Sequence, residues 1–426
     1  MKAVGTDQPA TPSALASSIR HAMSSNLVLV GFAEALAAPE VVWSLVDEGF
    51  QVIAFARRGR ASALRHSRHV VCHEICPPEL DLQASLADLR ALLVSLGGQP
   101  DNAQRILFPL DDKAVSLCSK LQLERPWLLA GPQNGAAELA LNKHLQISAA
   151  RQAGFNVPET LLARSADEIF SSDVAKSFPV ILKPAHCVPA VDGRVYEGRK
   201  SICASRDEFE RAVKDWAERT PLLVQQFVTG IGEGVFGLAT PDGIRAWSAH
   251  RRLRMMNPEG SGSSACISQP VTPDVRSKTE QLIGNTGWRG LFMIELLRDS
   301  SGKLWFMELN GRPWGSMALS RRQGLEYPAW QVKVAIDPES GAGRAMSATP
   351  DVVCRHAGRE FMHILFVLRG ARSKAVKNWP SFWSTVTDVI SVHDRDTLYN
   401  WRREDAKVFL ADCYYTVHDN VFKSRL

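Results

Sequence analysis

Two acidic residues stand in apolar segments on either side of one short turn. Glu295 lies in "LFMIELL", Glu308 lies in "LWFMELN", and the turn signal "DSSG" (299–302) separates them. A hairpin closed at this turn places Glu295 directly opposite Glu308 or one diagonal step away. Two carboxylates at that range repel each other unless cations bridge them. The chain must therefore fold so that positive charge reaches this hairpin.

The segment that carries Glu308 has further polar groups at every second position. Because side chains of a strand alternate between its faces, one face is expected to hold Leu304, Phe306, Glu308, Asn310 and Arg312. Mg²⁺ prefers oxygen ligands and phosphate oxygens, so Asn310 adds a neutral ligand, and Arg312 can hold phosphate or a carboxylate through two hydrogen bonds. A surface hairpin with solvated acids is the alternative, but idle charges are costly in apolar surroundings. We interpret both glutamates and Asn310 as metal ligands.

Composition limits the function classes. The 426 residues are 45% hydrophobic and 22% charged, which is ordinary for a globular chain of about two to four domains. The formal charge of +5 suits anionic small substrates but is too weak to indicate nucleic acid. We find no apolar signal core and no run long enough to span a bilayer, so we expect a cytoplasmic protein with no membrane partner. The eight cysteines are scattered, and "CHEIC" (72–76) is interpreted as reduced and structural rather than metal-binding.

The first part of the chain has the pattern of a parallel βαβ unit. Strand, helix and strand patterns are followed by two further strand patterns, over 26–32, 38–50, 51–60, 105–112 and 127–132. The first turn, "GFAEAL", lacks the G-x-G-x-x-G spacing, so a dinucleotide site is not expected. We predict a flexible leader over 1–26 and a Rossmann-like α/β domain over 27–135.

From residue 136 a helical pattern follows, and from about residue 178 the pattern changes to antiparallel hairpins with intervening helices. One continuous helix is expected from residue 136, stopped by Gly154 and Pro158. Strand patterns follow over 178–185, 222–228, 234–254 and 291–310. We predict an α+β domain over 136–335 and a mostly helical region over 336–426, with Trp379 and Trp383 in its core.

Three further segments carry candidate functional residues. Lys183 ends the apolar strand "FPVILKPA", where a compact ammonium suits a phosphate, although a snorkelling lysine is the alternative. "LLVQQFVTGIGEG" runs from a strand into a glycine-rich bend, whose backbone can bond an adenine edge and whose Glu233 is placed to meet ribose. Arg252 and Arg254 in "AHRRLR" join Arg312 as candidates for stabilising a transferring phosphoryl group, with a solvated basic strand as the alternative.

Together these segments resemble the ATP-grasp superfamily over about residues 27–335. The shared order is a Rossmann-like domain, a lysine in "LNKHLQISAARQAGFNVPET", a lysine in "VILKPA", the hinge strand "VQQFVTG", and the final "IELLRD" and "FMELNGRPWGS". The resemblance implies that residues 136–335 form an ATP-grasp domain of two α+β subdomains. The longer segment "AHCVPAVDGRVYEGRKSI" (185–202) stands where many members carry a glycine-rich phosphate lid, and we expect a lid that also touches the acceptor substrate.

The resemblance assigns roles to named positions. It implies that Lys143 and Lys183 contact the ATP phosphates and that Glu233 binds the ribose. The adenine contacts fall on the hinge residues Gln225, Gln226, Phe227 and Val228. The magnesium-bridging set falls on Glu295, Glu308 and Asn310, followed by Arg312.

The resemblance also implies a reaction. Such enzymes are ADP-forming carboxylate-amine ligases, which activate a carboxylate as an acyl phosphate and join it to an amine. The implied cofactors are ATP and Mg²⁺, two ions, with Mn²⁺ as a substitute, and the implied substrates are a small carboxylate and an amine such as an amino acid. A homodimer stays open. The alternatives are an ATP-grasp phosphotransferase (kinase) and a nucleotide-binding protein without enzymatic activity.

Overall fold

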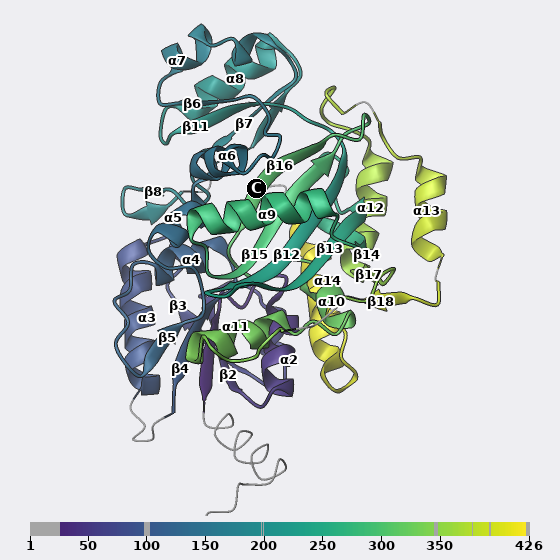
Figure 1. Cartoon of the computed structure of the whole chain (residues 1–426). Helices are drawn as coiled ribbons and strands as arrows, with labels where there is room; N and C mark the ends of the chain where they lie inside the picture. The colour runs from purple at the N-terminus through teal and green to yellow at the C-terminus, as the bar shows by residue number, and fades with distance from the viewer. Residues whose placement is uncertain are drawn as a thin grey trace, which may run out of the picture.

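The computed structural model describes residues 26–97, 103–196, 198, 200–344, 348–376, 378–391 and 393–422. The predicted leader over 1–26 lies outside them except for its last residue. Three larger sheets and one two-stranded sheet, with helices packed on them, make up the described part (Figure 1).

A five-stranded parallel sheet forms the first domain, in the order β3-β2-β1-β4-β5. Its strands are β1 (Leu27–Gly31), β2 (Gln51–Arg57), β3 (Val71–Ile75), β4 (Arg105–Pro109) and β5 (Trp127–Leu129). Its helices are α2 (Ala38–Asp47), α3 (Leu82–Gly97) and α4 (Asp112–Cys118), with the 3-10 turn η1 (Ala63–His66). Val30 packs on the α2 side with Trp43, whereas Leu29 packs on the α3 side with Leu89. Apolar burial on both faces explains the continuous apolar strands and confirms the Rossmann-like prediction.

The helix predicted from residue 136 is two helices, because the chain turns at Asn142. α5 (Gly135–Leu141) ends there and α6 (Lys143–Gln152) begins, while Asn142 itself has φ −106° and ψ 101°. Its Oδ1 accepts hydrogen bonds from the amides of His144 and Leu145. An asparagine side chain satisfies the free amides of a helix start well. The single-helix prediction was wrong, and the break makes Lys143 the first residue of α6.

Four antiparallel strands form a small subdomain in the order β10-β7-β11-β6. They are β6 (Thr160–Ala163), β7 (Val180–Pro184), β10 (Ser201–Cys203) and β11 (Leu222–Gln226), covered by α7 (Ala166–Ser171), η2 (Val174–Lys176) and α8 (Arg206–Trp216). Leu182 and Val224 pack with Phe209 of α8 on one face. Lys183 and its cross-strand partner Leu223 therefore take the other face, which packs on α6.

The segment between β7 and β10 forms the hairpin of β8 (Ala190–Val191) and β9 (Arg194–Val195). It is attached to the first domain by two backbone bonds: Leu82 donates to Gly193 at 2.9 Å and Val195 donates to Pro78 at 2.8 Å. Val188 and Val195 are buried in the apolar core of that domain. The predicted lid segment is thus held at its middle by the first domain.

Seven strands form the large sheet, in the order β16-β15-β12-β13-β14-β17-β18. They are β12 (Ile231–Thr240), β13 (Gly243–Met255), β14 (Ser263–Gln269), β15 (Gly290–Arg298), β16 (Leu304–Asn310), β17 (Val353–Arg355) and β18 (Asp396–Leu398). The associated helices are α9 (Pro273–Thr286), α10 (Met317–Arg322), α11 (Tyr327–Ile336) and α12 (Ala357–Arg369). Neighbouring strands are antiparallel except β17 and β18. Figure 1 shows α9 lying across this sheet, with the small subdomain above it. Two α+β subdomains follow the Rossmann-like domain, as predicted.

A β-bulge in β16 corrects the predicted alternation. Glu295 pairs with Glu308, but Leu296 pairs with Phe306, so Met307 is an extra residue. Phe306 and Leu309 pack into the core that contains Leu282 of α9 and Trp288, which follows that helix. Glu308 and Asn310 take the opposite face. The prediction that Leu304 and Phe306 share the face of Glu308 was therefore wrong, because one inserted residue reverses the alternation.

The C-terminal region is mostly helical, with α13 (Phe382–Ile390), the 3-10 turn η3 (Arg403–Asp405) and α14 (Ala406–Val421), but β17 and β18 join the large sheet. Trp379 is partly buried and donates from Nε1 to the carbonyl of Val367 at 3.1 Å. Trp383 is 76% exposed, so its predicted core position was wrong. The reason is that α13 buries only Thr385. No helix in the described residues has the length and apolarity needed to cross a membrane.

The bulge makes a testable prediction about stability. Phe306→Ala should lower the free energy of unfolding by about 3–5 kcal/mol, because it deletes a buried ring and leaves a cavity. Trp383→Ala removes a larger but exposed side chain and should change it by about 0.5 kcal/mol or less. Urea unfolding followed by far-ultraviolet circular dichroism measures both. Equal losses in the two variants would contradict the burial of Phe306 by the bulge.

Candidate active site

The two predicted acids face each other across the hairpin. Glu295 of β15 and Glu308 of β16 are direct cross-strand partners, which confirms the nearer of the two predicted registers. Arg252 of β13 reaches Glu295 with an Nη2 to Oε1 distance of 2.8 Å. Asn310 donates from Nδ2 to Glu308 Oε1 at 3.2 Å, so its carbonyl oxygen stays available as a ligand. Two acids and one amide oxygen thus gather at one end of the hairpin.

Cations from three segments of the chain balance the charge on Glu308. Burial alone would raise the pKa of this carboxyl, but Lys143, Lys200 and Arg312 hold it below its ordinary value. The carboxylate is therefore ionised at neutral pH although it is partly buried. A charged, partly buried carboxylate surrounded by cations is suited to binding a metal ion together with an anionic ligand.

Lys143 is placed by the helix break at Asn142. Its amide donates to the carbonyl of Ala185 at 2.8 Å, and its Nζ lies 2.7 Å from Cys187 Sγ. Burial raises the pKa of the Cys187 thiol. The ammonium group of Lys143 is nearly enclosed, with Glu308 among the charges that act on it.

Lys183 enters from β7 on the face of the small subdomain that points away from its own core. Burial lowers its pKa to about 8, although Glu308 opposes the shift. Gln225 lies on the same face, donates from Nε2 to Thr160 Oγ1 at 2.7 Å, and keeps a buried Oε1 without a hydrogen-bond partner among the described residues. This face therefore presents a cation and a free acceptor to the space above the acid pair.

Arg312 joins the site to the first domain. Its Nε and Nη2 donate to the two carboxylate oxygens of Asp112 at 3.0 and 3.3 Å. Asp112 begins α4 directly after β4, at the carboxyl edge of the parallel sheet, where open α/β sheets bind ligands. The bidentate pair ties this edge to the end of the hairpin.

Two predicted residues are engaged elsewhere. Glu233 forms a bidentate pair with Arg298 at 2.6 and 2.9 Å, and Arg254 forms one with Glu360 of α12. A ribose contact by Glu233 requires an exchange of partner, and so does a phosphoryl contact by Arg254. Both roles stay predictions.

The hinge residues Gln225 and Gln226 end β11, and Phe227 and Val228 lead towards β12. The amides of Gln226 and Phe227 donate to the carbonyls of Glu159 and Pro179 at 2.9 and 3.1 Å. The Gln226 side chain is exposed, and Val228 is partly buried. The structure places these residues at the passage between the two subdomains, and their contacts with adenine stay predictions.

The donor set suits a metal ion that shares its shell with phosphate. Within the described part of the chain, no three His, Cys, Asp or Glu side chains gather as a closed metal site, and this includes Cys72, His73 and Cys76. Mg²⁺ is commonly held by one or two carboxylates plus substrate phosphates rather than by a protein cage. Glu295, Glu308 and Asn310 fit that pattern.

Sequence reasoning missed several residues that complete the site. Cys187 and Lys200 carry no recognisable signal, whereas the acid pair in "FPLDD" was a readable signal for Asp112. His250 on β13 is buried and forms a hydrogen bond with Ser316, with an Nδ1 to Oγ distance of 3.0 Å. Burial lowers the pKa of its imidazole to about 3. His250 is therefore neutral, and it lies two residues before Arg252 on β13.

A charged cluster at the carboxyl edge of the first sheet also went unpredicted. Arg57 donates its amide to Glu34 Oε1 at 2.7 Å and its Nη1 to Glu79 Oε1 at 2.8 Å. Glu34 Oε2 and Glu79 Oε2 are buried and have no hydrogen-bond partner among the described residues. Such a cluster can hold an ammonium and a carboxylate at once.

Comparisons with known proteins agree with this arrangement. No family model matches the chain. The formate-dependent phosphoribosylglycinamide formyltransferase of Ignicoccus hospitalis is 23% identical over 305 residues, which are 68% of this chain and 70% of that protein. The D-alanine–D-alanine ligase of Chromohalobacter salexigens is 24% identical over 287 residues, which are 60% of this chain and 87% of that protein.

A solved structure agrees over most of the chain. The N5-carboxyaminoimidazole ribonucleotide synthetase in complex with ADP matches with a TM-score of 0.58 at 14% identity, over 85% of this chain and 96% of that one. With the order of the motifs and the two subdomains behind a Rossmann-like domain, these likenesses show that the chain has the fold of the ATP-grasp ligases.

Proposed function

We propose that this protein is a ligase that uses ATP to activate a small carboxylate as an acyl phosphate and joins it to an amine, with release of ADP and phosphate. One observation carries the proposal: Glu295 and Glu308 face each other in register, Arg252 contacts Glu295, and Lys143, Lys200 and Arg312 surround Glu308. We place the enzyme in the cytoplasm, which supplies ATP.

The metal and the phosphates have separate holders in this proposal. Glu295, Glu308 and Asn310 would hold Mg²⁺, which neutralises phosphate charge and aligns the transfer, and two ions or Mn²⁺ suit the same oxygen ligands. Lys143 and Lys183 bind the phosphate oxygens as point charges. Arg252 at the acids and Arg312 at the domain junction stabilise charge on the transferring group.

The bond changes need no side-chain nucleophile. A carboxylate oxygen attacks the γ-phosphorus, the bond to the β,γ-bridging oxygen breaks, and ADP leaves with that electron pair. The amine nitrogen then attacks the acyl carbon, the carbon–nitrogen bond forms, a proton leaves the nitrogen, and phosphate departs. The chain's residues bind, orient and stabilise charge in both steps.

The two relatives support a carbon–nitrogen bond as the product. One is named a D-alanine–D-alanine ligase and the other a formate-dependent phosphoribosylglycinamide formyltransferase. Each name therefore pairs a small carboxylate substrate with an amine. An amino acid is accordingly our first choice for the amine substrate.

Removing one acid tests the metal role. Glu308→Gln should lower ADP release by about 100-fold or more, because the metal loses a charged ligand while the shape of the side chain is kept. The matched control is Glu280→Gln on α9, whose carboxylate is 54% exposed and lies 4.0 Å from Arg276 of the same helix. ADP release is measured by a coupled assay, and circular dichroism checks the fold. Full turnover in Glu308→Gln would refute the assignment.

Isotope transfer tests the acyl phosphate. A screen of carboxylates against amino acids, read by ADP release and product mass, identifies the substrate pair. With that carboxylate labelled by ¹⁸O, one labelled oxygen should appear in the released phosphate for each amide formed, because the carboxylate oxygen becomes the bridging oxygen. A phosphorylated product that accumulates without any amine would instead indicate a phosphotransferase. Nucleotide binding without any ADP release would indicate a non-enzymatic protein.

The pH dependence of nucleotide binding tests Lys183. Its pKa of about 8 means that the ammonium form is lost as pH rises through that value. The dissociation constant of a non-hydrolysable Mg-ATP analogue should therefore increase by about tenfold between about pH 7 and pH 9. Calorimetry in buffers of different ionisation enthalpy should show proton uptake on binding over the same interval. Lys183→Arg keeps its charge and should give a flat profile; a flat profile in the wild type would contradict the phosphate role.

A further inference from the structure

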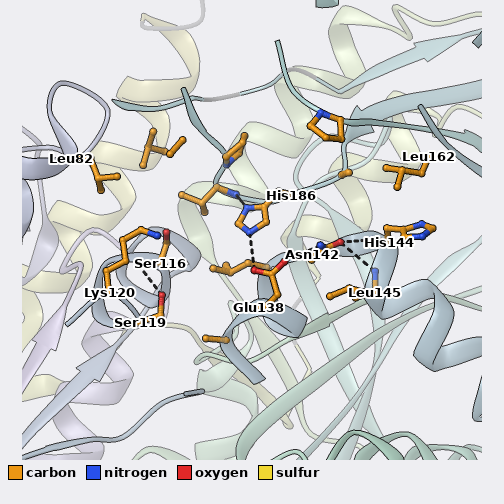
Figure 2. A pocket seen from close by; sticks show the side chains of 18 of the residues that line it. Leu82, Ser116, Ser119, Lys120, Glu138, Asn142, His144, Leu145, Leu162 and His186 are labelled. Carbon is orange, nitrogen blue, oxygen red and sulfur yellow. Dashed lines mark hydrogen bonds and ion pairs between the residues drawn. The ribbon is translucent and has the colours of Figure 1, made fainter. Parts of the chain in front are cut away.

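A cavity lies outside the nucleotide site, at the joint between the first domain and the small subdomain. Its volume of about 690 Å³ is within the usual range for small-molecule pockets. α4, α5, the start of α6, β6 and the segment that runs from β7 to β9 contribute to its lining. Figure 2 shows His186 and Glu138 at its centre, with Lys120 on one side and Leu162 on the other.

One wall of this cavity is also a wall of the nucleotide site. Asn142 and His186 form a β-bridge, and the flanking bonds run from the Lys143 amide to Ala185 and from the Cys187 amide to Leu141. Lys143 and Cys187 contact each other beside Glu308. Asn142 and His186 line the cavity instead. Successive residues of the bridged segments therefore serve two sites on opposite sides of one thin wall.

The cavity offers positive charge that no protein carboxylate takes up. Among the residues that the structure describes, neither Lys120 nor Arg164 has an acidic group within ion-pair distance, and both line the cavity. His186 accepts the Val188 amide at Nδ1, so in the neutral ring the proton is on Nε2, which lies 3.8 Å from Glu138 Oε2 and can donate to a ligand. Two free cations and one ring donor thus line the same cavity.

The rest of the lining is largely apolar. Leu82, Leu145, Leu162 and Val188 contribute, and they come from four different segments. Glu138 is the acidic member, but it is 54% exposed and accepts a hydrogen bond from Asn142 Nδ2 at 2.9 Å. The Glu138 carboxylate is thus partly solvated at the edge of the cavity and hydrogen-bonded to Asn142 of the β-bridge. A ligand that matches this lining has an anionic head and an apolar body.

We propose that this cavity is a second ligand site, which takes a small organic anion with an apolar body and is coupled to the nucleotide site through the shared wall. The anion lies against Lys120, Arg164 and His186, and the apolar part lies among the leucines. A ligand in the cavity contacts His186 and so stabilises its β-bridge with Asn142. The same bridge fixes the position of Lys143, which faces the nucleotide site. By linkage, each ligand then changes the affinity of the other by the same factor.

Binding of 4-phenylbutyrate to the full chain tests the site, with 4-phenyl-1-butanol as the neutral twin. Calorimetry is done with a saturating non-hydrolysable Mg-ATP analogue, so that the nucleotide site is filled. Lys120→Met should raise the dissociation constant of 4-phenylbutyrate by about tenfold, which corresponds to the loss of one charge-assisted contact. Leu145→Trp should abolish binding by filling the cavity; Leu145 is 41% exposed, so the larger ring can be accommodated. The butanol should bind at least about tenfold more weakly than the acid.

The matched control is Lys214→Met, which removes an exposed lysine of α8 that does not line the cavity. It should bind 4-phenylbutyrate as the wild type does. Wild-type affinity in both Lys120→Met and Leu145→Trp, or no binding of the acid up to about 10 mM, would overturn the site. Should Leu145→Trp fail to fold, Lys120→Met still decides, because Lys120 is exposed.

The coupling has its own readout, which does not depend on turnover. The dissociation constant of the ATP analogue is measured with and without saturating 4-phenylbutyrate. A change of about fivefold or more, with the same factor for 4-phenylbutyrate in the reverse titration, supports the shared wall. An unchanged constant would overturn the coupling.

Discussion

The repulsion between Glu295 and Glu308 is the constraint on which the rest of this structure depends. The antiparallel register of β15 and β16 makes the two carboxylates direct neighbours, and each meets a cation from elsewhere in the chain. Arg252 reaches one from β13, and Lys143 acts on the other from α6. Four parts of the chain converge here, because a partly buried pair of like charges is stable only when opposite charge surrounds it.

The convergence also explains how the domains are joined. Arg312, just beyond the hairpin, binds Asp112 of the first domain, and the hairpin of β8 and β9 packs into the same domain. The small subdomain is therefore attached to the first domain on one side and to the large sheet on the other. In the proposed function, a nucleotide held between Lys183 and the acids would contact all three parts and would thereby link nucleotide binding to domain arrangement. The cavity behind the wall of Asn142 and His186 lies at the same joint, which is the reason that we expect it to act on the nucleotide site.

Local chemistry made some features predictable. The turn "DSSG" between two apolar segments was sufficient to place the acids opposite each other or one diagonal step apart, and the apolar runs of the first domain were sufficient for four of its five parallel strands. Other features depended on interactions that no window of sequence contains. The bulge at Met307 moved Phe306 into the core, Asn142 divided a helix whose periodicity was continuous, and Trp383 stayed exposed because α13 has little to pack against. In each case the outcome depended on how neighbouring elements meet.

The sequence by itself determined most strands of the first domain, the hairpin with its two acids, and Lys183 at the end of its apolar strand, because these follow from turn chemistry and from the periodicity of apolar residues. Only the tertiary structure decided how the charges pair. Arg254 binds Glu360, Glu233 binds Arg298, and Lys143 lies against Cys187, although nothing in the spacing of these residues predicts it. Ion pairing depends on distances of a few ångströms between residues that are far apart along the chain, and folding alone sets those distances.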